Sequence, residues 1–179
     1  ADIPACVDLS GTDLSDVTLL RRVSSLQLTC CPLLCEVSAL RFARRLDLSF
    51  CASLCDVSAL GNVEELDLRG CTGVRDVSAL GRVRKLNLNN CNGVTDVSAL
   101  GGVHELSLGG CTSVRDVSAL GRVSKLDLTN CPLLEDVSAL GAVHSLYLNM
   151  CVRVRDVSAL GGVRVLSLAS CHRVSDISA

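Results

Sequence analysis

The stretch Val63–Cys71, with the sequence VEELDLRGC, occurs with substitutions eight times along this 179-residue chain. Its final cysteine recurs every twenty residues, at Cys31, Cys51, Cys71, Cys91, Cys111, Cys131, Cys151 and Cys171. Its two leucines keep the same period. A fixed period of this length predicts a solenoid, in which each repeat buries its apolar side against its neighbours.

The apolar residues within one repeat indicate its local structure. They are Val63, Leu66, Leu68, Cys71, Val74, Val77 and Leu80, separated by spacings of 3, 2, 3, 3, 3 and 3. An amphipathic α-helix would mix spacings of 3 and 4. The spacing of 2 indicates a short strand, and the runs of 3 indicate tight turns or brief 3₁₀ segments. We therefore predict an α/β-type solenoid: a mostly parallel sheet with short turns or 3₁₀ segments on its back.

The repeats run without insertion from residue 16. Residues 1–15 are expected to form a degenerate first repeat, in which Val7-Asp8-Leu9 lies one residue out of register. Residues 16–179 hold eight repeats of twenty residues and a C-terminal stub, 176–179. A glycine at 61, 81, 101, 121, 141 and 161 follows the turn in most repeats, and we expect it to take a positive φ at that corner.

Composition narrows the functional classes. The formal net charge is -2, and the chain has twelve cysteines, two phenylalanines, one tyrosine and no tryptophan. This charge balance predicts neither a nucleic-acid nor a membrane partner, and no apolar run approaches the length of about 18 residues that spans a bilayer. Eight cysteines take one repeat position, where they replace an apolar residue, so we expect reduced buried thiols and an intracellular, cytoplasmic setting.

The motif Leu66-x-Leu68-x-x-Cys71-x-x-Val74 resembles the leucine-rich repeat family in its cysteine-containing form. The segment 76–80, DVSAL, is similar to an element of the bacterial internalins, and short repeats of this kind are also similar to those of trypanosomatid leucine-rich repeat proteins. The resemblance implies a structural cysteine that bonds backbone groups at the corner after the strand. It also implies binding through the exposed face of the sheet.

Four cysteines, two in the repeated column and two outside it, leave alternatives open. Cys31, Cys35, Cys51 and Cys55 have spacings that resemble a four-thiolate zinc site. The repeat register instead places Cys31 and Cys51 inside and Cys35 and Cys55 outside, which favours structural thiols over a metal site. A Cys35–Cys55 disulfide between adjacent repeats is a further alternative under oxidising conditions.

A column of carboxylates precedes the Val-Ser-Ala-Leu turns. Stacked carboxylates could bind calcium, but each can also accept the free N–H groups two or three residues on, and we favour this capping role. The capping residues are Asp56, Asp76, Asp96, Asp116, Asp136 and Asp156.

Polar side chains on either side of the central strand leucine are the candidates for partner binding. They alternate in charge along the repeats, and Tyr, Arg and Trp are the side chains that most often dominate interfaces. The candidates are Arg45, Glu65, Asp67, Arg69, Lys85, Glu105, Lys125 and Tyr147.

The sequence contains no nucleophile–base constellation or phosphate-binding loop, so it predicts no enzyme, cofactor or metal. We expect a non-enzymatic scaffold that binds a protein partner through the sheet face. The alternatives are a self-assembling array and an extracellular adhesion or receptor fragment. The last repeat contains Leu166, Leu168 and Ile177. We expect it to be continued by a longer parent protein, to pair end to end in a homodimer, or to form the frayed end of a monomer.

Overall fold

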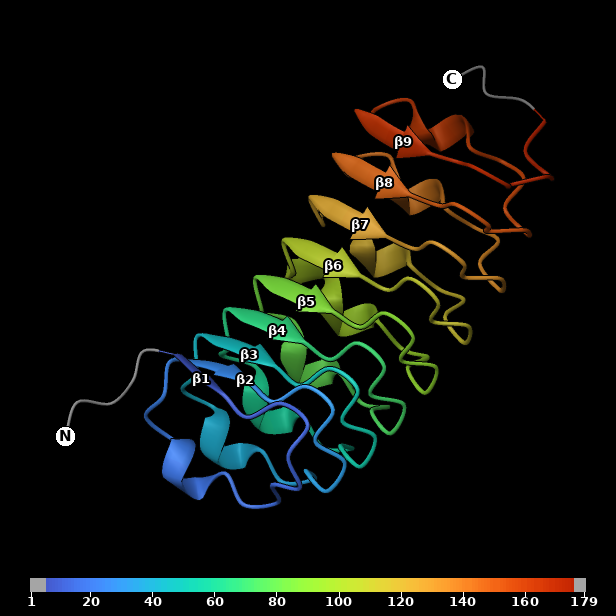
Figure 1. Cartoon of the computed structure of the whole chain (residues 1–179). Coiled ribbons are helices and arrows are strands. Elements are labelled where there is room, and N and C mark those ends of the chain that lie inside the picture. The colour runs from blue at the N-terminus through green and yellow to red at the C-terminus, as the bar shows by residue number, and fades with distance from the viewer. Residues whose placement is uncertain (1–5, 176–179) are drawn as a thin grey trace.

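The computed structural model describes residues 6–175, which form a single sheet of nine parallel strands in chain order (Figure 1). Each strand is three residues long and belongs to one repeat, here called a rung. The same position in successive rungs is called a column. The strands are β1 (Cys6–Asp8), β2 (Ser25–Gln27), β3 (Arg45–Asp47), β4 (Glu65–Asp67), β5 (Lys85–Asn87), β6 (Glu105–Ser107), β7 (Lys125–Asp127), β8 (Ser145–Tyr147) and β9 (Val165–Ser167).

The register of the sheet repeats the period of the sequence. From β2 onward each strand residue pairs with the residue twenty positions later, so that Leu46, Leu66 and Leu86 are aligned. The first strand is the exception, because Val7 pairs with Leu26 and the first rung is therefore one residue shorter. Val7-Asp8-Leu9 thus joins the sheet despite its shifted spacing.

The spacing of 3 in the apolar pattern corresponds to hydrogen bonds between residues three apart. In one rung the N–H groups of Cys71 and Val74 donate to the carbonyls of Leu68 and Cys71, at 3.0 and 3.2 Å. On the back of the rung the N–H of Leu80 donates to Val77 at 2.9 Å. Such turns form the 3₁₀ segments η1 (Thr18–Leu20), η2 (Ser38–Leu40), η3 (Ser58–Leu60), η4 (Ser78–Leu80), η5 (Ser98–Gly102), η6 (Ser118–Leu120), η7 (Ser138–Leu140) and η8 (Ser158–Leu160).

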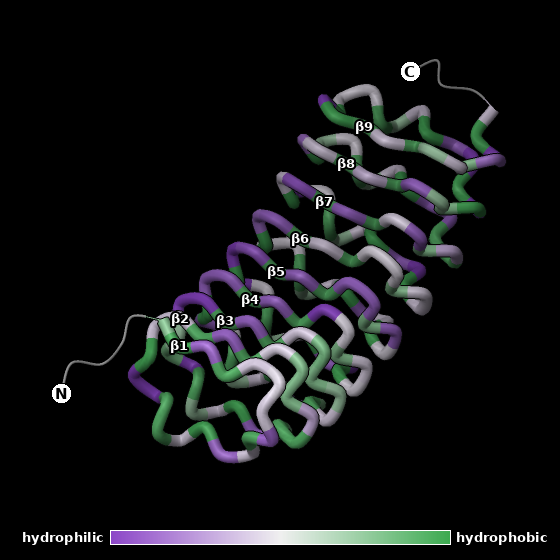
Figure 2. The backbone as a smooth tube through the Cα atoms, in the orientation of Figure 1, coloured by the Kyte–Doolittle hydropathy of each residue, from purple (hydrophilic) through white to green (hydrophobic). Residues whose placement is uncertain are grey.

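The core is a continuous stack of aliphatic side chains between the sheet and these turns. Leu68, Val74 and Leu80 have no exposed surface, and their equivalents in neighbouring rungs are buried in the same way. Figure 2 shows hydrophobic and hydrophilic residues alternating along the backbone of the rungs. All helical segments among residues 6–175 are short turns, and none has the length or apolar composition of a membrane-spanning helix.

The expectation of a positive φ at the glycine after each turn is wrong. Gly61, Gly81 and Gly121 have φ values of -60°, -62° and -60°, which any residue can adopt. Glycine is favoured there because the rungs approach closely. A Cβ on Gly101 would lie 2.5 Å from the carbonyl oxygen of Ala119 in the next rung.

Positive φ occurs instead at the residue before the ladder cysteine. The values lie between 56° and 74°, and the residues are Cys30, Phe50, Gly70, Asn90, Gly110, Asn130, Met150 and Ser170. Half of this column is Gly or Asn, the residues that adopt the left-handed region most readily. The corner that leads from the strand to the cysteine therefore sets the conformational constraint of each rung.

The last described rung is less covered than the others. Leu166 is 38% exposed, whereas its equivalent Leu146 in the preceding rung is fully buried. Leu168 is partly buried against the core, and Ile177 lies outside the described residues. The expected pairing of two copies at this rung stays a prediction.

Candidate functional site

The outward face of the sheet carries a hollow of about 830 Å³ that extends over strands β1 to β6. Its lining includes the polar side chains that flank the strand leucines and parts of Leu26, Leu46, Leu66 and Leu86 themselves. The polar side chains face outward because alternate residues of a strand point to opposite faces. Five of the eight residues that the sequence marks for partner binding line it: Arg45, Glu65, Asp67, Lys85 and Glu105. Arg69, Lys125 and Tyr147 do not line the hollow.

The charges in the hollow form a ladder of ion pairs between rungs. Glu65 lies 3.3 Å from Arg45 on one side and 3.9 Å from Lys85 on the other. Lys85 also lies 3.5 Å from Glu105. These side chains are substantially exposed, so each pair contributes at most about 1 kcal/mol to stability. These side chains can therefore leave their ion pairs and bind charges of another protein with a small loss of stability.

A second set of ion pairs lies where the chain enters the strands. Glu64 accepts a hydrogen bond from Arg44, with an ion-pair distance of 2.9 Å, and lies 3.7 Å from Arg84. The hydrogen bond from Arg44, followed by its charge, lowers the pKa of Glu64. Two arginines, Arg44 and Arg84, therefore share the single carboxylate of Glu64.

The Asp67 column has a structural role that spacing alone does not reveal. The N–H of Arg69 donates to Oδ1 of Asp67 at 2.9 Å, which holds the backbone as it leaves the strand. Asp47 and Asp127 bind the equivalent N–H groups in their own rungs, each at 2.9 Å. Asp67 is therefore less available to a partner than its exposure suggests.

In the two rungs with serine in this column, the backbone N–H that follows the strand has a different acceptor. Ser107 has no side-chain carbonyl oxygen, and the N–H of Gly109 instead donates to Oδ1 of Asn89, one rung earlier, at 2.7 Å. Likewise the N–H of Ala169 donates to Oδ1 of Asn149 at 2.9 Å. A side-chain oxygen thus meets the same backbone N–H in both arrangements.

Tyr147 lacks the side-chain acceptor that the other rungs provide for the backbone N–H after the strand. It occupies the Asp67 column but has no oxygen close to its own backbone, so it cannot replace the carboxylate as a local acceptor. A position that breaks a local structural rule is a candidate for function. Arg69 lies 3.2 Å from the Asp67 carboxylate and 5.9 Å from the centre of the Phe50 ring, so both its charge and its plane are engaged within the chain.

Replacement of Asp67 by alanine should lower the free energy of unfolding by about 1 kcal/mol, because the N–H of Arg69 loses its acceptor. Asp67→Asn, which keeps an oxygen at that place, should restore most of the loss. Chemical denaturation of both variants measures the difference. Glu65→Ala is the matched control in the same strand and should change stability by less than Asp67→Ala; an equal or larger loss would contradict the structural role.

The carboxylates on the back of the rungs accept N–H bonds from the turns that follow them. Asp76 accepts from Ser78 at 2.9 Å, and this bond lowers the pKa of Asp76. Distances between 2.7 and 2.9 Å recur along the column, at Asp16, Glu36, Asp56, Asp96, Asp116, Asp136 and Asp156. One oxygen of each carboxylate is thus engaged with the backbone, which supports capping over a cation ladder.

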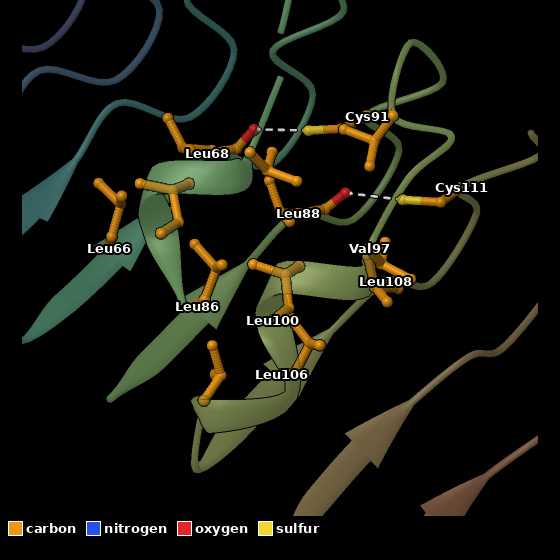
Figure 3. Close-up of a cluster of buried hydrophobic side chains, with 14 of the residues drawn as sticks. Leu66, Leu68, Leu86, Leu88, Cys91, Val97, Leu100, Leu106, Leu108 and Cys111 are labelled. Atoms are coloured by element: carbon orange, nitrogen blue, oxygen red, sulfur yellow. Dashed lines mark hydrogen bonds between the residues drawn. The ribbon is translucent and has the colours of Figure 1, made fainter. Parts of the chain in front are cut away.

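The cysteine ladder links each rung to the one before it. Sγ of Cys91 donates to the carbonyl oxygen of Leu68 at 3.1 Å, and Cys111 donates to Leu88 at 3.0 Å (Figure 3). The carbonyl of Leu68 also accepts the N–H of Cys71 in its own rung, at 3.0 Å. The thiol therefore satisfies the second lone pair of a buried carbonyl while packing as a small apolar group.

Burial makes these thiols poor nucleophiles. Loss of solvent around the thiolate raises the pKa from 9.0 to about 12 for both Cys71 and Cys91. The same cause raises the pKa of Cys51, Cys111 and Cys151 to about 11 and that of Cys131 further. Since the thiolate is the reactive form, the ladder should be inert in the folded protein.

The remaining cysteines are exposed free thiols: Cys6, Cys30, Cys35 and Cys55. The residues considered for zinc are split as the register implies, with Cys31 and Cys51 buried and Cys35 and Cys55 on the surface. Within residues 6–175, no three His, Cys, Asp or Glu side chains are grouped to hold a metal ion.

Alkylation in native buffer near neutral pH should label four thiols per chain, and alkylation after unfolding should label all twelve. The eight ladder thiols should resist because they are buried. Intact mass spectrometry counts the labels. Rapid native labelling of Cys71, Cys91 or Cys111 would contradict a buried ladder, and two labels fewer with a mass loss of two hydrogens would reveal a Cys35–Cys55 disulfide.

The chain was compared with known proteins and structures. No protein-family model and no curated protein matches it. Its structure is similar to that of internalin C2 of Listeria monocytogenes, with a TM-score of 0.68 and 21% identity over 92% of this chain and 80% of that one.

Two longer proteins of the same bacterium are also similar in structure. One is the functional domain of InlJ, which includes a cysteine ladder (TM-score 0.60, 18% identity, 97% of this chain). The other is internalin F (TM-score 0.57, 18% identity, 94% of this chain). The chain spans 46% of the InlJ structure and 65% of the internalin F structure.

These likenesses, at identities below one quarter, bear on the fold. The nine parallel strands, the 3₁₀ turns and the repeat of about twenty residues all agree with them. The predicted architecture and the buried cysteine ladder are confirmed. The chain therefore has the leucine-rich repeat fold.

Proposed function

We propose that the chain is a non-enzymatic scaffold that binds a protein partner through the outward face of its sheet, at the hollow over β1 to β6. The observation that carries this proposal is the hollow itself, about 830 Å³ and lined by charged and amide side chains from successive rungs. Proteins with this fold typically bind other proteins. The contact residues and the partner are part of the proposal.

The shape and chemistry of the hollow favour a protein over a small molecule. It extends over six strands and is bordered by exposed ion pairs such as Arg45–Glu65. Sites for small molecules are usually enclosed, whereas this hollow is open along the strands. A polar surface at one-rung spacing suits a polypeptide that presents complementary charges over several rungs.

The engagement of the polar columns supports a non-catalytic role. On the sheet face Asp47, Asp67 and Asp127 hold backbone N–H groups, and on the back Asp76 and its equivalents do the same. Glu65 and Lys85 are held in ion pairs. Groups held in this way are less available for proton transfer.

The four exposed thiols support an intracellular setting as part of the proposal. Cys30, Cys35 and Cys55 are free and exposed in neighbouring rungs. Exposed thiols persist where the glutathione and thioredoxin systems keep them reduced. Intact mass of the protein isolated with rapid alkylation would test this setting.

Inversion of the whole charge ladder should abolish partner binding and leave folding intact. The variant carries Arg45→Glu, Glu65→Lys, Lys85→Glu, Glu105→Lys and Lys125→Glu. Every internal pair keeps opposite signs, so the melting temperature should stay close to that of the intact chain. The charges offered to the partner are all reversed, which should weaken binding by at least about tenfold.

The measurement is the affinity of a partner captured by the intact chain, by calorimetry, for both proteins. The control variant Arg75→Glu, Arg115→Glu and Arg155→Glu changes charge on the back of the rungs and should bind normally. Undiminished binding by the inverted ladder would overturn the proposed surface.

A further inference from the structure

The charges of the chain are strongly sorted in space. The five residues that lead from each turn into its strand occur eight times, at 21–25, 41–45, 61–65, 81–85, 101–105, 121–125, 141–145 and 161–165. They hold eleven of the seventeen Lys and Arg residues but three of the nineteen Asp and Glu residues. This basic edge therefore carries eleven positive and three negative charges, although the net charge of the chain is -2.

Most cations of the basic edge are unpaired. The three glutamates engage Arg44, Arg84, Arg45 and Lys85. The other seven cations are exposed and form no ion pair with any residue between 6 and 175. They are Arg21, Arg22, Arg41, Arg82, Arg122, Lys125 and Arg164.

Two large apolar side chains are exposed to solvent beside these cations. Leu19 is 95% exposed and Phe42 is 69% exposed. Every later rung has alanine in the Leu19 column, and the Phe42 column is otherwise polar, charged or small. Neither exposure results from a missing neighbouring rung, because Ala79 and Arg82 in the same columns are exposed in the middle of the solenoid.

Leu19 and Phe42 lie diagonally across two adjacent rungs. Leu19 borders the same surface hollow as Arg21 and Arg22, and Phe42 occupies the Arg22 column in the next rung. The guanidinium of Arg41 lies 4.6 Å from the centre of the Phe42 ring. Apolar tips and cations thus project together at one end of the basic edge.

We propose that the basic edge is a peripheral binding surface for an anionic lipid bilayer, with Leu19 and Phe42 inserted between the lipid head groups. The strand starts lie in a row along one side of the solenoid in Figure 1, and the segments that enter β4 to β7 are hydrophilic in Figure 2. Eight rungs at a spacing of about 4.8 Å give a row of roughly 34 Å. A flat charged surface can contact such a row along its length.

The apolar tips favour a bilayer over the other polyanions. A nucleic acid would attract the cations, but Leu19 offers no stacking surface, and the edge contains one Phe and no Tyr or Trp on which bases could stack. A protein would need a pocket shaped for each tip. The interface of a bilayer accepts Leu and Phe without a complementary shape, and each nearby Lys or Arg adds attraction to acidic head groups.

The test is co-sedimentation of the intact chain with vesicles of phosphatidylcholine, with and without phosphatidylserine, at low and high salt. Binding should require phosphatidylserine. The variant Arg22→Glu, Arg82→Glu and Arg122→Glu should bind at least about tenfold more weakly. The variant Leu19→Ser and Phe42→Ser should also bind more weakly, and its remaining binding should be lost more readily in salt.

The matched control is Arg75→Glu, Arg115→Glu and Arg155→Glu, which makes the same change in net charge on the back of the rungs. It should bind vesicles as the intact chain does. All substituted residues are exposed, and thermal melts verify that each variant is folded.

Three results would overturn the proposal: no sedimentation of the intact chain, equal losses in the two arginine variants, or no effect of the Leu19 and Phe42 changes. Tighter binding to single-stranded DNA or to polyglutamate, with the same dependence on Arg22, Arg82 and Arg122, would assign the edge to that class of partner instead.

Discussion

The carbonyl of the leucine that directly follows each strand is the group on which the rest of the fold depends. In rung four the Leu68 oxygen accepts the N–H of Cys71, which turns the chain off the sheet, and the thiol of Cys91, which fixes the next rung. A buried carbonyl without these donors would be costly, since no water reaches it. A small, weakly polar thiol satisfies it without leaving a void, and this explains the strict cysteine period.

The sequence was sufficient to predict whatever depends on spacing within a rung. The Leu66-x-Leu68 pair indicated the strand, and the later spacings of 3 correspond to the observed turns. Contacts between rungs were harder to predict, because they join residues twenty positions apart. The glycine at 101 was assigned to a positive φ, whereas its role is to admit the carbonyl of Ala119. The hydrogen bond from Gly109 to Asn89 was missed for the same reason. The bond from the N–H of Arg69 to Asp67 is local, and it was missed because Asp67 was assigned to partner binding.

The regular columns of this molecule and its departures from the repeat carry different information. Charges that alternate from rung to rung, such as Glu65 and Lys85, pair with one another and keep the sheet face soluble and adaptable. Departures from the repeat are more informative: Tyr147 in a column of acceptors, and Leu19 and Phe42 among exposed cations. The net charge of the whole chain concealed that second feature, because acidic turns on the back offset a basic edge.

If every rung depends on its immediate neighbours alone, removal of 76–115 should leave the fold intact. The deletion takes out two whole rungs, joins Arg75 to Asp116 within an unchanged local sequence, and brings Glu65 beside Lys125 with opposite charges. Circular dichroism should show an unchanged spectrum per residue and one cooperative melt at a lower temperature, since fewer interfaces remain. An unfolded or non-cooperative product would contradict this account of the solenoid.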